Sequence, residues 1–124
     1  MIPIVLTIPA PCEWITANQR LHWAVKSRRV KEWRAATAWR AARAVPAVDG
    51  PVHITATIHR DHNRGRFDPN NWADTAKACV DGLVDAGVLR DDSSRYVTGP
   101  DMRAGDPWAD AAFVLTITQQ GENA

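Results

Sequence analysis

The feature that most constrains the fold is a long helical segment from about Gln19 to Val45, rich in alanine, arginine and lysine. Pro46 stops it, because proline cannot continue a helix. Its apolar positions recur every three or four residues, as one helix face requires; they are Val30, Trp33, Thr37, Ala41 and Ala44. This face must pack against another element of the protein.

Strands are expected before and after this helix in the sequence. Residues 52–59 alternate Val, Ile, Ala and Ile with His, Thr, Thr and His, which predicts a strand with one buried face. Residues 2–8, 95–102 and 112–118 also have the composition of strands. The tryptophans Trp23 and Trp39 of the long helix are assigned to the core, although stacking on bases is the alternative.

A second helix is expected from Asn71 to Ala86, closed by Gly87 at the position after the cap. Its apolar face comprises Trp72, Ala76, Cys79, Val80 and Leu83. The element order β-α-β-α-β-β therefore predicts an α+β fold, a mixed sheet with two main helices packed on it. At 124 residues, one domain over residues 1–120 is expected, with a frayed tail at 121–124.

The net charge of only +1 conceals an uneven distribution. The long helix and its approach hold eight of the fifteen Lys and Arg residues, whereas residues 61–92 hold seven of the fourteen acidic residues. The helix is interpreted either as an ordinary solvated surface or as a phosphate-binding surface, and the second is favoured because crowded like charges repel unless a polyanion compensates them. The candidate DNA-binding residues are Arg28, Arg29, Lys31 and Arg34, with Arg64 and Arg66 in the loop before Asp68.

The acidic centre has the residue types of a magnesium site. Cleavage of a phosphodiester needs charge stabilisation and an activated water, which divalent metals can supply. Mg²⁺ prefers oxygen ligands and retains several waters, so a few carboxylates suffice. Asp68, Asp91 and Asp92 would converge if the second helix packs back on the sheet.

Lys77 lies on the polar side of the second helix, between Asp74 and Asp81. It is interpreted either as a group that stabilises negative charge on a phosphate, or as one half of an exposed helical ion pair worth about 0.5 kcal/mol. The residues alone leave these two readings equally open.

These motifs together resemble the RusA family of Holliday-junction resolvases. The segment Arg66–Trp72, then Lys77, Asp81-Gly82-Leu83, Ala86-Gly87 and Asp91-Asp92, is similar to that family's D-x-D-N, lysine, D-[AG]-L, A-G and D-D pattern. The opening strand, Asn18 and the basic helix also resemble the family's N-terminal region, so the likeness covers nearly the whole chain.

The resemblance implies a magnesium-dependent endonuclease, with Mn²⁺ as an alternative metal, that acts as a homodimer on branched DNA. Such enzymes resolve four-way junctions by paired symmetric nicks. Asp68, Lys77 and Asp92 would then be catalytic, and Asp68, Asn70, Asp91 and Asp92 would bind metal. A magnesium-dependent nuclease acting on flaps or other branched DNA is a further alternative.

Two departures from the family pattern affect the metal ligands. Asn70 stands where the family has its second aspartate, and three extra residues precede Lys77. Asp74, within this insertion, is a further candidate ligand. An amide oxygen can still bind Mg²⁺, more weakly because it carries less charge; a catalytically weak or inactive branched-DNA-binding protein is therefore the second hypothesis.

Other sites and locations are less favoured. His59, His62 and the cysteines Cys12 and Cys79 lack a C-x-x-C pair, so a zinc site has little support. The start of the chain lacks the pattern of a secretory signal, no segment has the length of a membrane span, and free thiols suit a reducing compartment. A cytoplasmic protein without membrane contact is expected.

Overall fold

The computed structural model describes residues 3–120. The elements in chain order are β1 (Ile4–Pro9), α1 (Trp23–Ala44), β2 (Val52–His59), the 3₁₀ turn η1 (Pro69–Trp72), α2 (Ala73–Asp85), β3 (Val97–Ala104) and β4 (Ala112–Gln119). The predicted α+β fold and its β-α-β-α-β-β order are confirmed. The expected frayed tail at 121–124 and the first expected strand residue, Ile2, lie outside the described residues.

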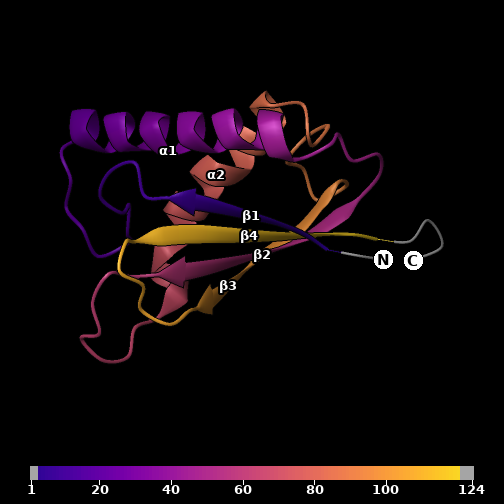
Figure 1. The fold of residues 1–124 in the computed structure, drawn as a ribbon. Coiled ribbons are helices and arrows are strands. Elements are labelled where there is room, and N and C mark those ends of the chain that lie inside the picture. The colour runs from indigo at the N-terminus through magenta and orange to yellow at the C-terminus, as the bar shows by residue number, and fades with distance from the viewer. Residues whose placement is uncertain (1–2, 121–124) are drawn as a thin grey trace.

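The four strands form one mixed sheet in the order β1-β4-β2-β3 (Figure 1). The last strand, β4, lies inside the sheet, antiparallel to both β1 and β2. Strand β3 runs parallel to β2 at the other edge. Parallel strands need a long crossover connection, and here the segment containing η1 and α2 provides it.

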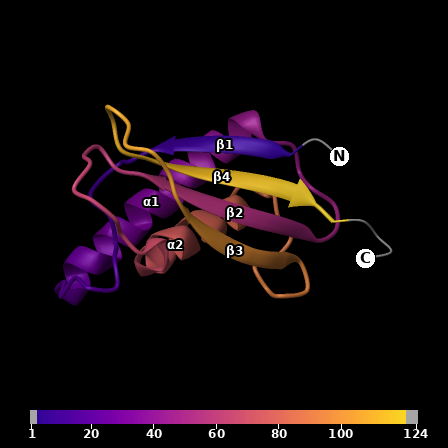
Figure 2. The same ribbon diagram turned by 90° about the horizontal axis from the view of Figure 1, so that it is seen from below.

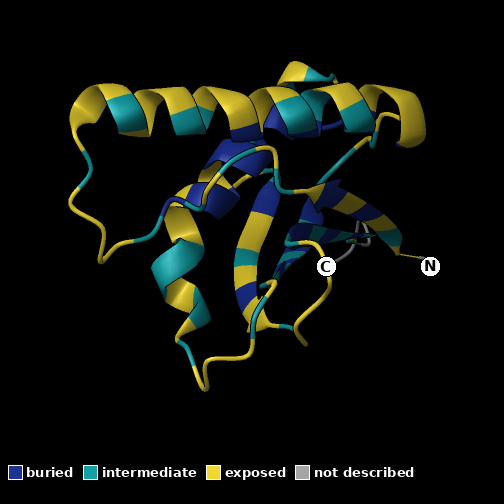
Figure 3. Cartoon of the chain, turned by 60° about the vertical axis from the view of Figure 1, so that its left-hand side comes forward, coloured by how far each residue is buried: buried dark blue, intermediate teal, exposed yellow. Residues whose placement is uncertain are grey.

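Both helices cover the same face of the sheet, as the view from below shows (Figure 2). Along β2 the covered face consists of Val52, Ile54, Ala56 and Ile58, all fully buried. The residues between them remain partly accessible on the other face, and Figure 3 shows the same contrast between buried and exposed sides along the helices. The period-two pattern of this segment therefore predicted both the strand and its buried face.

Helix α1 begins at Trp23, four residues later than expected from the sequence. The His22 Nδ1 atom accepts a hydrogen bond from the Ala24 backbone at 3.2 Å and caps the first turn. The buried residues are Trp33, Thr37 and Ala41, in agreement with the predicted apolar face. Ala44, also placed on that face, is exposed because it lies at the end of the helix.

The assignment of Trp23 and Trp39 to the core was wrong. Their exposed fractions are 77% and 57%. At about 100° per residue, position 39 points away from the buried Trp33 and Thr37, and the Trp39 ring instead lies under the Arg43 guanidinium, 4.0 Å away. Trp23 opens the helix beside His22, with 5.6 Å between the ring centroids.

The second helix is divided into two parts. The 3₁₀ turn η1 precedes α2, so Trp72 belongs to this turn and is only partly buried. Gly87, with φ +77°, occupies the predicted position after the cap. Its N–H donates to Val84 and the Val88 N–H donates to Leu83, both at 3.0 Å, which satisfies the last helical carbonyls.

Strand β3 begins at Val97 rather than Arg95 and extends to Ala104, because residues 93–96 form a turn. Its pairing with β2 shifts register between His53 and Thr55. Pro100 lies at this irregularity, on an edge strand, where a missing N–H is tolerated.

Candidate functional site

The loop after β2 places Asp68 at the start of η1. Its Oδ1 atom accepts a hydrogen bond from the Asn70 backbone at 3.0 Å, and Pro69 follows as the first residue of the turn. Proline suits this position because its fixed φ matches the turn and no donor is lost. This hydrogen bond fixes the position of Asn70 relative to Asp68. The Asp68 side chain itself is exposed.

Lys77 on α2 lies between two carboxylates. Its Nζ atom is 3.0 Å from Asp92 Oδ2 and 3.4 Å from Asp81 Oδ1. The hydrogen bond to Asp92 is the main cause that raises the pKa of Lys77, and the same bond lowers the pKa of Asp92. Both groups are therefore charged at neutral pH, and the Lys77 side chain remains 68% exposed.

Asp91 and Asp92 have different surroundings. The Asp91 Oδ1 atom accepts a hydrogen bond from the Asp92 backbone N–H at 2.7 Å, so the Asp91 side chain stabilises the turn. The Asp92 carboxylate instead contacts Lys77 on the neighbouring helix. Of this pair, Asp92 is the residue that the fold brings to Lys77.

Asn70, Lys77 and Asp92 line one cavity of about 360 Å³ between η1, α2, the turn after α2 and strand β3. These three residues come from separate parts of the sequence, as the predicted site requires. Asp68, two residues before Asn70, and Asp91, next to Asp92, do not line it. The fold thus brings two of the five candidate metal ligands, Asn70 and Asp92, into one cavity, and Asp68 and Asp91 are close to them in the chain.

Asp74 lies elsewhere. Its Oδ2 atom pairs with Lys26 Nζ on α1 at 3.2 Å, and both residues line a second cavity of about 180 Å³. Of the two helical ion pairs considered for Lys77 from the sequence, the one with Asp81 is present, and Lys77 pairs with Asp92 in place of Asp74. Asp74 is therefore not placed to add a carboxylate to the cavity lined by Asn70.

The donor types of the cavity fit a magnesium ion. Mg²⁺ in proteins often takes only one or two carboxylates and completes its shell with waters and substrate phosphate. The Asp92 carboxylate and the Asn70 amide are oxygen donors of this kind, with Asp68 close in the chain. Within residues 3–120, no three His, Cys, Asp or Glu side chains gather into a preformed metal-binding group.

The basic residues predicted to contact DNA fall into two groups. Arg29 is only 13% exposed and donates to the Trp14 carbonyl at 3.0 Å and to Glu13 at 2.7 Å. Arg34 makes two hydrogen bonds with Asp85, which raise the pKa of Arg34 and lower that of Asp85. These two guanidinium groups are already occupied by contacts within the protein.

The other four candidates present their charge to solvent. Arg28, Lys31, Arg64 and Arg66 are exposed, and none of them takes part in an ion pair within residues 3–120. Arg28 and Lys31 lie on α1, whereas Arg64 and Arg66 precede Asp68. These four remain available to a phosphate backbone.

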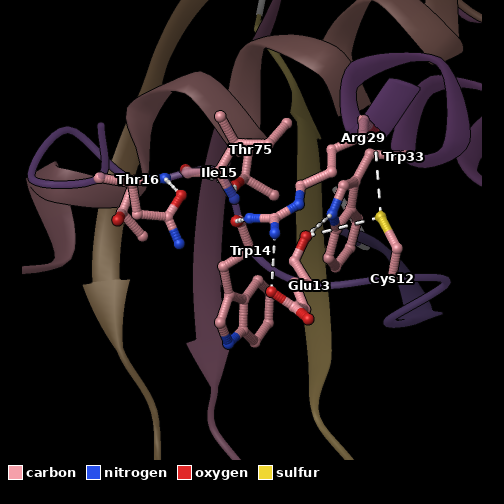
Figure 4. A network of polar contacts seen from close by, with 9 residues as sticks. Cys12, Glu13, Trp14, Ile15, Thr16, Arg29, Trp33 and Thr75 are labelled. Atoms are coloured by element: carbon pink, nitrogen blue, oxygen red, sulfur yellow. Dashed lines mark hydrogen bonds and ion pairs between the residues drawn. The ribbon is translucent and has the colours of Figure 1, made fainter. Parts of the chain in front are cut away.

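The segment after β1 is held by a polar network (Figure 4). The buried Thr75 hydroxyl donates to the Ile15 carbonyl at 2.8 Å and accepts from its N–H at 3.0 Å. Trp33 Nε1 donates to the Glu13 carbonyl at 3.1 Å. A threonine among the small apolar residues of α2 is the sequence signal that could have indicated this role.

Sequence reasoning also missed a larger cleft of about 1240 Å³. Its lining comes from the end of β1, the loop after it, the loop after β2, and the approach to β4: Pro9, Ala10, Cys12, Glu13, Trp14, Gln19, Asp61, His62, Arg64, Asp110 and Ala111. Burial raises the pKa of the Cys12 thiol to about 12, so it stays protonated and is a poor nucleophile.

Neither a known protein-family model nor any curated protein matches this chain. The fold and the geometry nevertheless define its class: an α+β domain with a four-stranded mixed sheet and a charged cavity where η1, α2 and β3 meet. No helix in residues 3–120 is long and apolar enough to cross a membrane.

Proposed function

We propose that the protein is a Mg²⁺-dependent endonuclease that resolves four-way DNA junctions by paired symmetric nicks, in the manner of the RusA family. One observation carries this proposal: Asn70, Lys77 and Asp92, spread over three segments, line one cavity in the order of that family's motif. The exposed basic residues Arg64 and Arg66, shortly before Asp68, add the charge that a DNA backbone attracts.

In this proposal each residue has a defined task. Asp92, Asn70 and Asp68 hold Mg²⁺, for which Mn²⁺ can substitute, and Asp91 orients the turn that carries Asp92. The bound ion supplies neutralisation of the phosphate charge and activation of the attacking water. Lys77, charged at neutral pH, stabilises the negative charge that develops on the phosphate.

The proposed enzyme works as a homodimer, because two opposed nicks at a two-fold symmetric junction need two sites related by symmetry. Arg28 and Lys31 on α1 contact the DNA arms. Two free thiols agree with a reducing cytoplasmic setting.

The direct test is incubation of the purified protein with an end-labelled four-way junction in Mg²⁺. We expect nicks at symmetric positions in one pair of opposed strands, no nicks in linear duplex of the same sequence, and no nicks in EDTA. A flap substrate in parallel separates a junction resolvase from a nuclease for other branched DNA. Absence of nicking at any excess of protein, in Mg²⁺ or in Mn²⁺, would refute the proposed activity.

A second candidate, a branched-DNA-binding protein with weak or no catalysis, is supported by two features. An uncharged amide stands at position 70, and Asp92 is already paired with Lys77 at 3.0 Å. Junction binding of equal affinity with and without Mg²⁺, together with no nicking, would favour this function.

A further inference from the structure

The cavity that holds Asn70, Lys77 and Asp92 has an unexpected lining for a site that would bind only a metal and a phosphate. Six of its nine lining residues have no polar side-chain atom: Ala73, Val80, Val97, Gly99, Pro100 and Met102. They come from α2 and from β3, between Val97 and Met102. A charged ligand alone gains nothing from such a wall, since ions and phosphates prefer water to apolar surface.

The size and composition of the cavity fit a different ligand. Its volume of about 360 Å³ falls within the range of roughly 300 to 1,000 Å³ usual for sites that take small organic groups, which combine apolar walls with a few polar side chains. A nucleobase has two apolar faces and a polar edge of donors and acceptors. The side-chain NH2 group of Asn70 can donate to such an edge while its amide oxygen holds the metal.

The charged residues indicate how such a base would be attached. Lys77 lies on the same cavity with its side chain 68% exposed, so its ammonium group can contact a phosphate outside while the wall contacts the base inside. A polynucleotide presents these two groups next to each other. The cavity therefore suits one nucleotide of a chain better than a free phosphate or a free apolar molecule.

We propose that this cavity receives a single unpaired base of the bound DNA, next to the phosphate that Lys77 contacts. This inference rests on the proposed nuclease function and adds a source of its selectivity. A base leaves the stack most easily where it is already unpaired or mismatched. A cavity that stabilises an extruded base therefore favours binding at branch points over binding to continuous duplex.

The structure shows where the cavity can be altered without disturbing the core. An added Cβ at Gly99 would lie 2.6 Å from the Ile54 carbonyl oxygen, so this part of the wall cannot accept a side chain. Ala73 lines the same cavity, yet it is exposed at the first position of α2. Substitution Ala73→Phe therefore fills the cavity from its solvent side. Ala47→Phe, in the exposed loop before β2, is the matched control.

The experiment uses a four-way junction that carries 2-aminopurine at one of several positions around the branch point, in EDTA so that no nicking occurs. The fluorescence of this base is quenched by stacking. We expect the fluorescence at one position to rise several-fold when the wild-type protein or Ala47→Phe binds. The Ala73→Phe variant should bind without this rise in fluorescence. Gel shift measures complex formation in each case.

Three outcomes would overturn the inference: no rise at any position in a complex that gel shift detects, an unchanged rise in Ala73→Phe, or no binding of either the junction or a single-stranded 2-aminopurine oligonucleotide. The nicking assay in Mg²⁺ is scored separately. A rise in fluorescence without nicking would support the base site and reject the nuclease function. Nicking without a rise in fluorescence would support the nuclease function and reject the base site.

Discussion

Lys77 Nζ lies 3.0 Å from Asp92 Oδ2 and thereby joins α2 to the turn that follows it. The contact raises the pKa of the lysine and lowers that of the aspartate. The pair is therefore charged over the whole range in which metal-dependent phosphate chemistry usually proceeds. Because both side chains are partly exposed, we expect the ion pair to contribute less than about 1 kcal/mol to the free energy of unfolding. Its position in the cavity matters more than its strength.

A substitution at position 70 tests whether a carboxylate there strengthens metal binding. The change Asn70→Asp adds a negative ligand to the cavity of Asp92, and ligand charge strengthens the binding of a divalent cation. The Mg²⁺ concentration that gives half-maximal nicking should fall about tenfold. Asn71→Asp, in the same turn but outside the cavity lining, should leave it unchanged. Equal Mg²⁺ dependence of both variants would show that position 70 does not contact the metal.

The exposed and the internally bonded basic residues of α1 should respond differently to mutation. Removal of the exposed charges with Arg28→Gln and Lys31→Gln should reduce the slope of log affinity for junction DNA against log salt by about two. The free energy of unfolding should change by less than about 0.5 kcal/mol.

Arg29→Gln is the matched comparison, one residue away. Loss of its hydrogen bonds to Trp14 and Glu13 should reduce the free energy of unfolding by about 1–3 kcal/mol and leave the salt dependence of DNA binding as in the wild type. Urea denaturation and DNA titrations over a range of salt measure both quantities. A reduced salt slope in Arg29→Gln alone would reverse our assignment of these side chains.

Gly82 marks the closest approach of the two helices. An added Cβ there would lie 2.5 Å from the Arg34 carbonyl oxygen and 2.8 Å from the Thr37 Cβ atom. Although alanine is favoured over glycine in a helix by about 1 kcal/mol, the separation of α1 from α2 should cost more. Gly82→Ala is thus expected to lower the free energy of unfolding by about 1–2 kcal/mol. A urea midpoint at or above that of the wild type would contradict this packing.

The ion pair of Arg34 with Asp85 predicts a pH-dependent contribution to stability. Since the pair lowers the pKa of Asp85 in the folded state, its contribution is complete above the unfolded pKa of an aspartate and is lost as the pH falls through the lower folded value. Asp85→Asn should therefore unfold at a lower temperature than the wild type at pH 7. This gap should begin to narrow below about pH 4 and close only below the lowered folded pKa of Asp85.

Thermal unfolding of both proteins between pH 7 and pH 3 provides the measurement. Asp110→Asn, at an exposed carboxylate without an ion pair in the described part of the chain, is the control and should show a small gap at every pH. A difference for Asp85→Asn that is as large at pH 3 as at pH 7 would require a cause other than the ion pair.

Local patterns predicted the parts of the fold that local physics determines. The alternation of residues 52–59 gave the bounds of β2 and its buried face, since a strand repeats every two residues. Gly87 indicated the end of α2 because a positive φ after a helix favours glycine. The bounds of α1 were less well predicted, because residues 19–22 suit a helix as well as a loop.

The remaining features depend on residues far apart in the sequence. Asp74 turns to Lys26, 48 positions earlier, and this partner is visible only once the two helices are packed. Arg29 and Arg28 are neighbours with the same charge, yet only Arg29 lies against the loop of Glu13 and Trp14. The exposure of Trp39 likewise depends on which side of α1 meets the sheet. Composition and spacing do not determine such contacts.

The central claim is that the cavity shared by Lys77 and Asp92 acts on DNA phosphates. It is tested most directly by the single-turnover rate of Mg²⁺-dependent nicking of a four-way junction by the variants Lys77→Gln and Asp92→Asn. Each should lose at least about 100-fold in rate while still binding the junction, because Lys77 stabilises transition-state charge and Asp92 holds the metal that activates water. Asp49→Asn, at a carboxylate that is 94% exposed and outside the cavity, should keep the wild-type rate. Nicking by either cavity variant at the wild-type rate would contradict the account.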